Sequence, residues 1–342
     1  MLRVDPAIAK ATLQMLANHQ GIEVNPRAEE EPGKILHEFS LDPQRSDVEL
    51  AHWDFPYYGS IDSTPLFIVV ACEYYRTTQD YSFLRSIWSN ILAAFRWITV
   101  SGDGDGDGYV EYLRMNPWGL FHQGWKDGVE DHLGIEPPVA MVEAQGYTYA
   151  AFQDLIFLEK ALGENNVADK LAVRSEALKT RFNEDYWMRQ ESYFALALDG
   201  DKRQKAVVTS NPGHLLFTGI VASDKVKPLV SRLFQADLWT SYGIRTHSDR
   251  EPDYDPYSYH KGSVWPHDNW IICKGLLNLG FTFQADRIKA ALLKAFKELG
   301  GISELYAVVD DRIIDLHEAE HVYANPLQAW SSAALLEMIW TD

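Results

Sequence analysis

The sequence predicts an all-α protein whose helices pair into hairpins around a toroid. Apolar residues recur at three- and four-residue spacing through most of the 342-residue chain, which is the pattern of amphipathic helices. Long loops rich in Gly, Pro, Asp and aromatic residues alternate with short polar loops such as residues 77–80. In two concentric rings of helices every second connection falls on the same face, so we expect the long loops, and the function, at one rim. Strands do not alternate with helices, which disfavours a parallel α/β sheet.

Ten segments show the helical spacing, and two short ones have strand character. The helices are expected at residues 6–19, 64–77, 81–100, 143–162, 165–182, 212–220, 223–235, 262–279, 284–299 and 325–340. The strands are expected at Gly108–Leu113 and Ser192–Leu198, the second followed by an Asp-Gly turn at 199–200.

The composition bounds the class of protein. With 46% hydrophobic residues the chain can bury a large core, so disorder is excluded, and its length suits one or two domains. The net charge of -18 disfavours nucleic acid or an anionic membrane as partner and favours a neutral or cationic substrate. Cys72 and Cys273 lie in apolar helical runs and suggest neither a disulfide nor a metal site. No secretion signal or apolar membrane span is evident, so we expect a cytoplasmic protein.

A Gly-Asp repeat at residues 102–108 resembles a calcium loop. The carboxylates of Asp103, Asp105 and Asp107, joined by Glu111, could converge on a hard cation while the glycines allow the sharp turn. The twelfth position of an EF-hand requires Glu, and here it is Arg114. The alternative is a turn that only starts the following strand, so a structural calcium ion stays an open prediction, and no other cofactor is expected.

The segment QGWKDG at residues 123–128 places Trp125, Lys126 and Asp127 in a Gly-bounded loop. An apolar ring beside a carboxyl group is what a glycosidase general acid requires, because it raises the pKa of the acid and offers a face for a sugar. The chain has 11 Trp, 17 Tyr and 15 Phe, which suits sugar binding but equally suits a packed core. Loop acids can also serve only solubility, and Glu130 and Asp131 are spare candidates.

A second carboxylate, Glu304 in GGISELY, stands between apolar residues where an unpaired charge is costly. A salt bridge to a nearby Arg is one explanation. The other is catalysis, because an acid at Asp127 and a base at Glu304 would form the carboxyl pair that glycoside hydrolysis needs.

Three further loops carry candidate residues. Asp62 precedes the helix at 64–77 and is either its N-cap, a role that Ser63 could share, or an acceptor for a sugar hydroxyl. His260, Trp265 and His267 belong to the densest polar and aromatic cluster of the chain, and the spacing of the two histidines disfavours zinc. Asn325 is the expected N-cap of the last helix.

Several strings in collinear order carry a family resemblance. They are EEEPGKILHEF (29–39), PYYGSIDSTPLF (56–67), DGDGYVEY (105–112), QGWKDG (123–128), PPVAMVEAQGY (137–147), SNPGHLLFTGI (210–220), YGIRTHS (242–248), DPYSYHKGSVWPHDN (255–269), SELY (303–306) and NPLQAW (325–330). The chain is similar to bacterial amylo-α-1,6-glucosidase-like proteins, which resemble glycogen-debranching and glucoamylase-type glycosidases.

This resemblance implies an (α/α)6 toroid, the six-hairpin glycosidase fold, as a single domain over residues 1–342 that hydrolyses α-1,6- or α-1,4-glucosidic bonds with inversion. Asp127 would be the general acid and Glu304 the general base. The remaining matched positions would line the sugar site: Asp62, Trp125, Lys126, His260, Trp265 and His267.

The chain also departs from the family pattern. We expect the N-terminal β-domain of longer relatives to be absent, and the helix count predicts that the first inner and last outer helices are missing, so self-association into a homo-oligomer is an alternative to an incomplete toroid. Two other functions stay open: a non-catalytic carbohydrate-binding toroid or inactive remnant, and a sugar isomerase or epimerase that uses His260 and His267.

Overall fold

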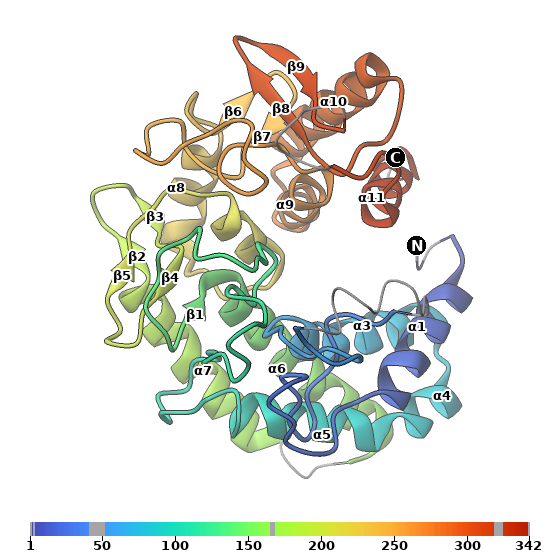
Figure 1. Cartoon of the computed structure of the whole chain (residues 1–342). Helices are drawn as coiled ribbons and strands as arrows, with labels where there is room; N and C mark the ends of the chain where they lie inside the picture. Colours follow the sequence, from blue (N-terminus) through green and yellow to red (C-terminus); the bar gives the residue numbers. More distant parts are fainter. Residues whose placement is uncertain (1, 3, 41–51, 165–167, 318–323, 341–342) are drawn as a thin grey trace. The chain divides into compact units, whose positions relative to one another are not determined.

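The structure is a computed structural model that describes the chain except residues 1, 3, 41–51, 165–167, 318–323 and 341–342 (Figure 1). The chain forms two compact units. Unit 1 comprises Met1–Phe182 and Ala197–Lys205, and unit 2 comprises Asn183–Leu196 and Ala206–Asp342. Each unit carries one of the two carboxylates that the sequence analysis selects for catalysis.

Unit 1 is a set of helices packed around α3 and α6. Its helices are α1 (Pro6–Asn18), α3 (Ser63–Thr78), α4 (Tyr81–Ser86), α5 (Trp88–Thr99), α6 (Val142–Leu162) and α7 (Ala168–Asp185), whose last three residues belong to unit 2. Helix α3 contacts α1, α5 and α6. Asp5 caps α1 by accepting from Ala7 N, and Gly163 ends α6 at a φ of 69°. Most residues of α6 are buried, including polar ones such as Gln145 and Thr148, so it is the central element of this unit.

Unit 2 is organised around α9. Its helices are the 3₁₀-helix η1 (Asn211–Phe217), α8 (Ser223–Leu233), α9 (Pro266–Asn278), α10 (Thr282–Leu299) and α11 (Ala329–Trp340). Helix α9 contacts η1, α10 and α11. Two glycines permit the closest of these contacts, because a Cβ at Gly275 would lie 2.5 Å from Leu216 and one at Gly213 would lie 2.6 Å from Ile272.

The described strands are short and antiparallel. In unit 1, β4 (Ala197–Leu198) pairs with β1 (Ala140–Met141) and β5 (Gln204–Lys205). In unit 2 the pairs are β2 (Trp187–Met188) with β3 (Tyr193–Phe194), β6 (Trp239–Thr240) with β7 (Gly243–Ile244), and β8 (Tyr306–Val309) with β9 (Arg312–Asp315). The sheets are small additions to two helical units, as expected of a mainly α-helical protein.

Most predicted helices are confirmed, and four are corrected. The helix predicted at 81–100 is two helices, α4 and α5, because Ile87 leaves the helical region with a φ of -103° and a ψ of 7°. The segment at 212–220 is a 3₁₀-helix that stops before Gly219, which has a φ of 82°. Helix α9 begins at Pro266 rather than residue 262, since Val264 pairs with Tyr306. For the helix predicted at 165–182, residues 165–167 lie outside the described part of the chain.

The last correction concerns α11, which begins at Ala329 rather than residue 325. Asn325 therefore does not cap this helix, and its amide groups bond to Glu304 instead. At α3, Asp62 holds the N-cap position, but its carboxylate makes no capping bond. Ser63 N donates to the hydroxyl of Ser60.

The structure differs more from the predicted strands than from the predicted helices. Gly108–Leu113 is a loop with a single bridge from Tyr112 to Val139. Ser192–Leu198 is divided between β3 in unit 2 and β4 in unit 1. The β8–β9 hairpin is not among the predicted strands. Its Asp310-Asp311 turn has φ values of 50° and 56°, the left-handed conformation that a tight hairpin turn requires and that Asp tolerates.

Other expectations have mixed outcomes. Cys72 and Cys273 are both buried, and neither forms a disulfide within the described chain. Among the described residues, no helix combines the length and apolar character needed to cross a bilayer. The following expectations stay predictions: the closed toroid, its two missing helices, the single domain, the homo-oligomer and the cytoplasmic location.

A buried ion pair between Arg232 and Asp237 generates a stability prediction. Two guanidinium nitrogens of Arg232 donate to the two Asp237 oxygens at 2.9 and 2.8 Å, and the residues are 4% and 2% exposed. Removing Asp237 leaves the buried Arg232 with only the half-exposed Glu191, 3.6 Å from its Nε, so we expect Asp237→Ala to reduce the free energy of unfolding by about 3 kcal/mol, the lower end for a broken buried pair. Urea unfolding measures this change. Asp201→Ala, which breaks an ion pair on an exposed loop, is the control, and an equally small effect of both substitutions would contradict the prediction.

Candidate active site

Three segments of unit 1 converge on Asp127. Backbone bonds join His37 N to Tyr57 O at 2.7 Å and Tyr57 N to Glu38 O at 2.9 Å. Ile61 N donates to Gln123 O at 2.9 Å. These bonds bring the segments that contain His37, Asp62 and Asp127 together, although they lie far apart in the sequence.

The loop that presents Asp127 is held closed by its own backbone. His122 forms a bridge with Gly128, and Phe121 N donates to Gly128 O at 2.6 Å. The loop packs closely on α6 at Gly124, where a Cβ would lie 3.1 Å from a carboxylate oxygen of the fully buried Glu143. Asp127 therefore stands near the end of a short, tightly anchored loop.

The electrostatics around Asp127 are set by His37 and Asp62. His37 Nε2 lies 3.4 Å from Asp127 Oδ2, and their side chains are 25% and 37% exposed. Burial alone would lower the pKa of His37, but the hydrogen bond to Asp127 and the charges of Asp127, Asp62 and Glu38 outweigh it and raise the pKa. Burial raises the pKa of Asp62, against the opposing effect of the hydrogen bond from Ser60. Asp127 is thus partly exposed and paired with an imidazole.

Trp125 and Lys126 are turned into the unit. Trp125 is 9% exposed and Lys126 is 1% exposed, with the Lys126 ammonium 5.3 Å from the Trp125 ring centroid. Neither residue therefore offers an open surface to a sugar here, and their role in substrate binding stays a prediction. Of the spare acids, Asp131 Oδ1 lies 3.3 Å from His122 Nε2, whereas Glu130 is exposed.

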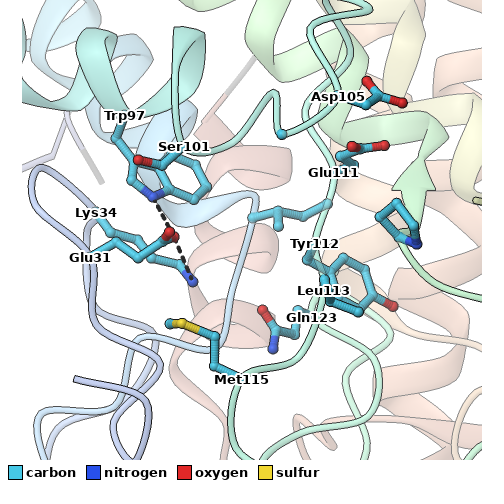
Figure 2. A pocket seen from close by; sticks show the side chains of 13 residues that line it. Glu31, Lys34, Trp97, Ser101, Asp105, Glu111, Tyr112, Leu113, Met115 and Gln123 are labelled. Atoms are coloured by element: carbon cyan, nitrogen blue, oxygen red, sulfur yellow. Dashed lines mark hydrogen bonds and ion pairs between the residues drawn. The ribbon is translucent and has the colours of Figure 1, made fainter. Parts of the chain in front are cut away.

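Unit 1 also contains a pocket of about 370 Å³ (Figure 2). Glu31 lies between Trp97 and Lys34 on one wall, where it accepts from the indole nitrogen at 2.8 Å, and Tyr112 and Gln123 line another part. Ile61 and Gln123 belong to the lining, but Asp62 and Asp127 do not. The volume is therefore separate from the Asp127 carboxyl group.

The carboxylates of the Gly-Asp loop form ion pairs with lysine and arginine side chains. Lys202 Nζ lies 2.9 Å from Asp105, 2.9 Å from Asp107 and 2.6 Å from Glu111, while Arg174 pairs with Asp103 at 2.6 Å. The hydrogen bonds that Lys202 donates to these carboxylates outweigh burial and hold its pKa above the ordinary value.

One oxygen from each of Asp103, Asp105 and Asp107 lies within 4.8 Å of the others, so a cation-binding geometry exists. Calcium binding at this loop stays a prediction. The Lys202 ammonium already supplies positive charge at the same carboxylates, so an ion would have to compete with it.

In unit 2, Glu304 is 2% exposed and is surrounded by neutral donors. Tyr259 OH donates to Oε1 at 2.8 Å, and Asn325 donates to Oε2 through its backbone N at 2.9 Å and its Nδ2 at 3.0 Å. Gln328 Nε2 also donates to Oε1, at 3.3 Å. The salt bridge to Arg that offered the alternative explanation is absent among the described residues. An arrangement of donors directed at both oxygens suits an ionised carboxylate.

The predicted sugar-lining residues of unit 2 form a buried aromatic cluster. The His260 ring stacks on Trp265 with centroids 5.4 Å apart, and His267 stacks on Trp330 at 4.2 Å and 5°. His260, Trp265 and His267 are buried, whereas Trp330 is 42% exposed. Burial lowers the pKa of His267 to about 3, so this imidazole is neutral at physiological pH. Trp330 is therefore the ring of this cluster that is open to a ligand.

Sequence reasoning missed several site residues. His37, Tyr259 and Gln328 all fall inside the collinear strings, but nothing in their spacing shows that they contact Asp127 or Glu304. The fully buried pair of His214 Nε2 and Asp268 Oδ1, 2.7 Å apart, was also missed, although the isolated histidine in SNPGHLL was a signal.

The pairing of His37 with Asp127 generates a prediction. Since the carboxylate raises the pKa of His37, Asp127→Asn should lower the pH at which His37 titrates. NMR titration of histidine-labelled protein measures this, with the His37 signal assigned by its loss in His37→Gln. Glu130→Gln, which removes an exposed acid of the same loop, should leave the titration unchanged. An identical His37 midpoint in wild type and Asp127→Asn would contradict the pairing.

The Gly-Asp loop generates a prediction about stability and calcium binding. Without the Lys202 ammonium the carboxylates of Asp105, Asp107 and Glu111 repel one another, so we expect Lys202→Met to reduce the free energy of unfolding by about 1–3 kcal/mol. Calcium should restore much of this loss in Lys202→Met and do less for the wild type, as calorimetry with CaCl₂ or EDTA would show. Lys205→Met, which removes a lysine bonded to Gly134 O, is the control. Equal calcium effects in wild type and Lys202→Met would show that the ion and the lysine do not compete.

Curated relatives of the chain hydrolyse glycosidic bonds according to their names. The chain is 26% identical over 159 residues to mannosylglycerate hydrolase MGH1 of Selaginella moellendorffii, covering 46% of this chain and 32% of that protein. It is 23% identical over 292 residues to a probable mannosyl-oligosaccharide glucosidase of Schizosaccharomyces pombe, covering 79% of this chain and 33% of the relative. The matches thus span about a third of the length of these relatives.

Solved structures show the same fold. The GH63 mannosylglycerate hydrolase from Thermus thermophilus, in complex with Tris, superposes with a TM-score of 0.70 at 18% identity, covering 99% of this chain and 90% of that one. The complex of the same enzyme with Tris and D-glycerate gives a TM-score of 0.71 at 19% identity, with 99% and 90% coverage.

The family itself is identified by its model, which describes the mannosylglycerate hydrolase MGH1-like glycoside hydrolase domain and matches residues 1–313. The resemblance to amylo-α-1,6-glucosidase-like proteins therefore holds at the level of a glycoside hydrolase, and these matches do not support glycogen debranching. The chain belongs to the MGH1-like glycoside hydrolase domain family, whose solved neighbours are GH63 enzymes.

Proposed function

We propose that the protein is an inverting α-glycosidase in which Asp127 is the general acid and Glu304 the general base. The observation that carries the proposal is the contrast between the two carboxyl groups. Asp127 is partly exposed beside a titratable imidazole, whereas Glu304 is buried and bonded only to neutral donors among the described residues. Two carboxyl groups in different environments can take different protonation states, which acid–base hydrolysis requires.

The proposed reaction is a single displacement. Asp127 gives its proton to the glycosidic oxygen while the bond from that oxygen to C1 breaks. Glu304 accepts a proton from a water whose oxygen attacks C1 from the opposite face, so the anomeric configuration inverts. This mechanism requires the carboxyl groups to be roughly 6.5–9.5 Å apart with the substrate bound.

For the substrate we propose a small α-mannoside or α-glucoside. The names of the relatives point to mannose or glucose as the sugar that is released. The net charge of -18 favours an uncharged group on the other side of the bond, because a negative surface repels an anionic one. Short α-1,6- and α-1,4-glucans remain candidates within this class.

The two alternatives make different demands. A carbohydrate-binding toroid without catalysis needs no working acid–base pair. A sugar isomerase needs a histidine that can exchange protons near neutral pH, and the lowered pKa of His267 argues against that role.

Activity measurements test the proposal. We expect Asp127→Asn and Glu304→Gln each to reduce kcat at least 10²-fold on α-mannosides and α-glucosides, since a positioned acid or base typically contributes about 10²–10⁴-fold. Glu130→Gln is the matched control and should retain activity. NMR of the first product should show the β-anomer, and mass spectrometry should show added water.

Each contrary result has a defined meaning. Full activity of either variant removes that residue from the mechanism, and release of the α-anomer excludes inversion. Sugar binding without turnover supports the binding toroid, and a product of unchanged mass supports the isomerase. α-Mannosylglycerol and α-mannosylglycerate, which differ in a carboxylate, report whether the acidic surface selects against anions.

A further inference from the structure

The carboxylate of Glu304 is fully occupied by hydrogen-bond donors. An ionised carboxyl group offers about four lone-pair positions, two on each oxygen. Tyr259 OH and Gln328 Nε2 donate to Oε1, and Asn325 N and Nδ2 donate to Oε2. A general base must also accept a hydrogen bond from the attacking water, so one of these donors has to leave before the reaction proceeds.

Asn325 is held too firmly to be that donor. Its backbone N and its side chain both bond to Glu304 Oε2, at 2.9 and 3.0 Å, and its carbonyl accepts from Glu304 N at 3.0 Å. Removing it would break three bonds and move the main chain.

Tyr259 is also fixed. Its bond to Oε1 is 2.8 Å long, well below the 3.3 Å of the Gln328 bond, and its ring packs edge-on against Trp265 with centroids 4.8 Å apart. Its carbonyl accepts from Trp265 Nε1 at 2.8 Å and from Ser263 Oγ at 2.7 Å. The phenol therefore stays on Glu304 as long as the segment before α9 is folded.

Gln328 differs from both. Its bond is the longest of the set at 3.3 Å, and it comes from the end of a partly exposed side chain immediately before α11. The Gln328 Oε1 accepts from Ala329 N at 2.7 Å, so the side chain has a second local anchor. Rotating the carboxamide away from Glu304 also gives up this bond to Ala329 N, but, unlike the removal of Asn325, it requires no movement of the backbone.

We infer, on the basis of the proposed function, that the Gln328 carboxamide holds the position on Glu304 Oε1 that the attacking water takes when substrate binds. Gln328 is then a positioning residue for the base. The exchange replaces one donor, N–H, with another, O–H, so the buried carboxylate keeps its full set of hydrogen bonds in both states. Without Gln328 the free enzyme would leave one lone pair of a buried charge unsatisfied.

The inference gives Glu304 different donors in the free enzyme and in the enzyme–substrate complex. The pH profiles of kcat/KM and of kcat report on these two states separately. The acidic limb of kcat/KM reports the base in free enzyme, and that of kcat reports it in the complex. We expect Gln328→Ala to move the acidic limb of kcat/KM to higher pH by about one unit, because a carboxylate with fewer donors is protonated more readily. The limb of kcat should not move, since water has already replaced Gln328 there.

Two variants make the experiment decisive. Tyr259→Phe removes a donor that stays in both states, so both limbs should move to higher pH. Gln328→Leu keeps the size of the side chain without its donor and should behave as Gln328→Ala does, which excludes an effect of lost packing. Near-UV circular dichroism checks that each variant is folded.

The outcomes also distinguish this inference from the proposed function. If both limbs move together in Gln328→Ala, Gln328 stays bonded throughout the reaction and the exchange is wrong. If neither moves in Gln328→Ala and Gln328→Leu, the bond does not act on the base, and the inference is equally wrong. Unimpaired turnover by Glu304→Gln, measured in parallel, would instead refute Glu304 as the base.

Discussion

The cost of keeping a carboxylate away from water governs the local structure of both units. A buried ionised group is stable only if charges or hydrogen-bond donors replace the water it has lost. Glu304 accepts hydrogen bonds from the loop before α9 and from the segment before α11. The stabilisation of its charge therefore connects parts of unit 2 that are distant in the sequence. The positions of Tyr259 and Asn325 follow from this requirement.

Unit 1 meets the same requirement with charged partners at the buried Asp103 and Glu111, while its partly exposed Asp127 faces a titratable imidazole. Asp127 faces His37, Asp103 faces Arg174, and Lys202 bridges Asp105, Asp107 and Glu111. A titratable partner can change its charge when the acid gives up a proton, whereas the neutral donors around Glu304 cannot. The difference between partners matches the different tasks that hydrolysis would assign to the two groups.

Sequence patterns predicted the helices well because helical periodicity is local. Helices α1, α3, α6 and α10 lie within a few residues of their predicted bounds. The errors occur where a tertiary contact overrides the pattern: Val264 pairs with Tyr306, which delays α9, and Asn325 bonds to Glu304 instead of capping α11. The two-residue strands are too short to leave a periodicity that a sequence could show.

The helical class, the acidic character and the residue types of the candidate pair follow from the amino-acid sequence, because they depend on composition, local spacing and collinear motifs. The folded chain adds the pairing of His37 with Asp127, the contacts of Lys202 with the Gly-Asp loop, and the four donors on the lone pairs of Glu304. Each of those contacts joins residues from separate segments. Their distances depend on the packing of helices and loops rather than on any pattern within one segment.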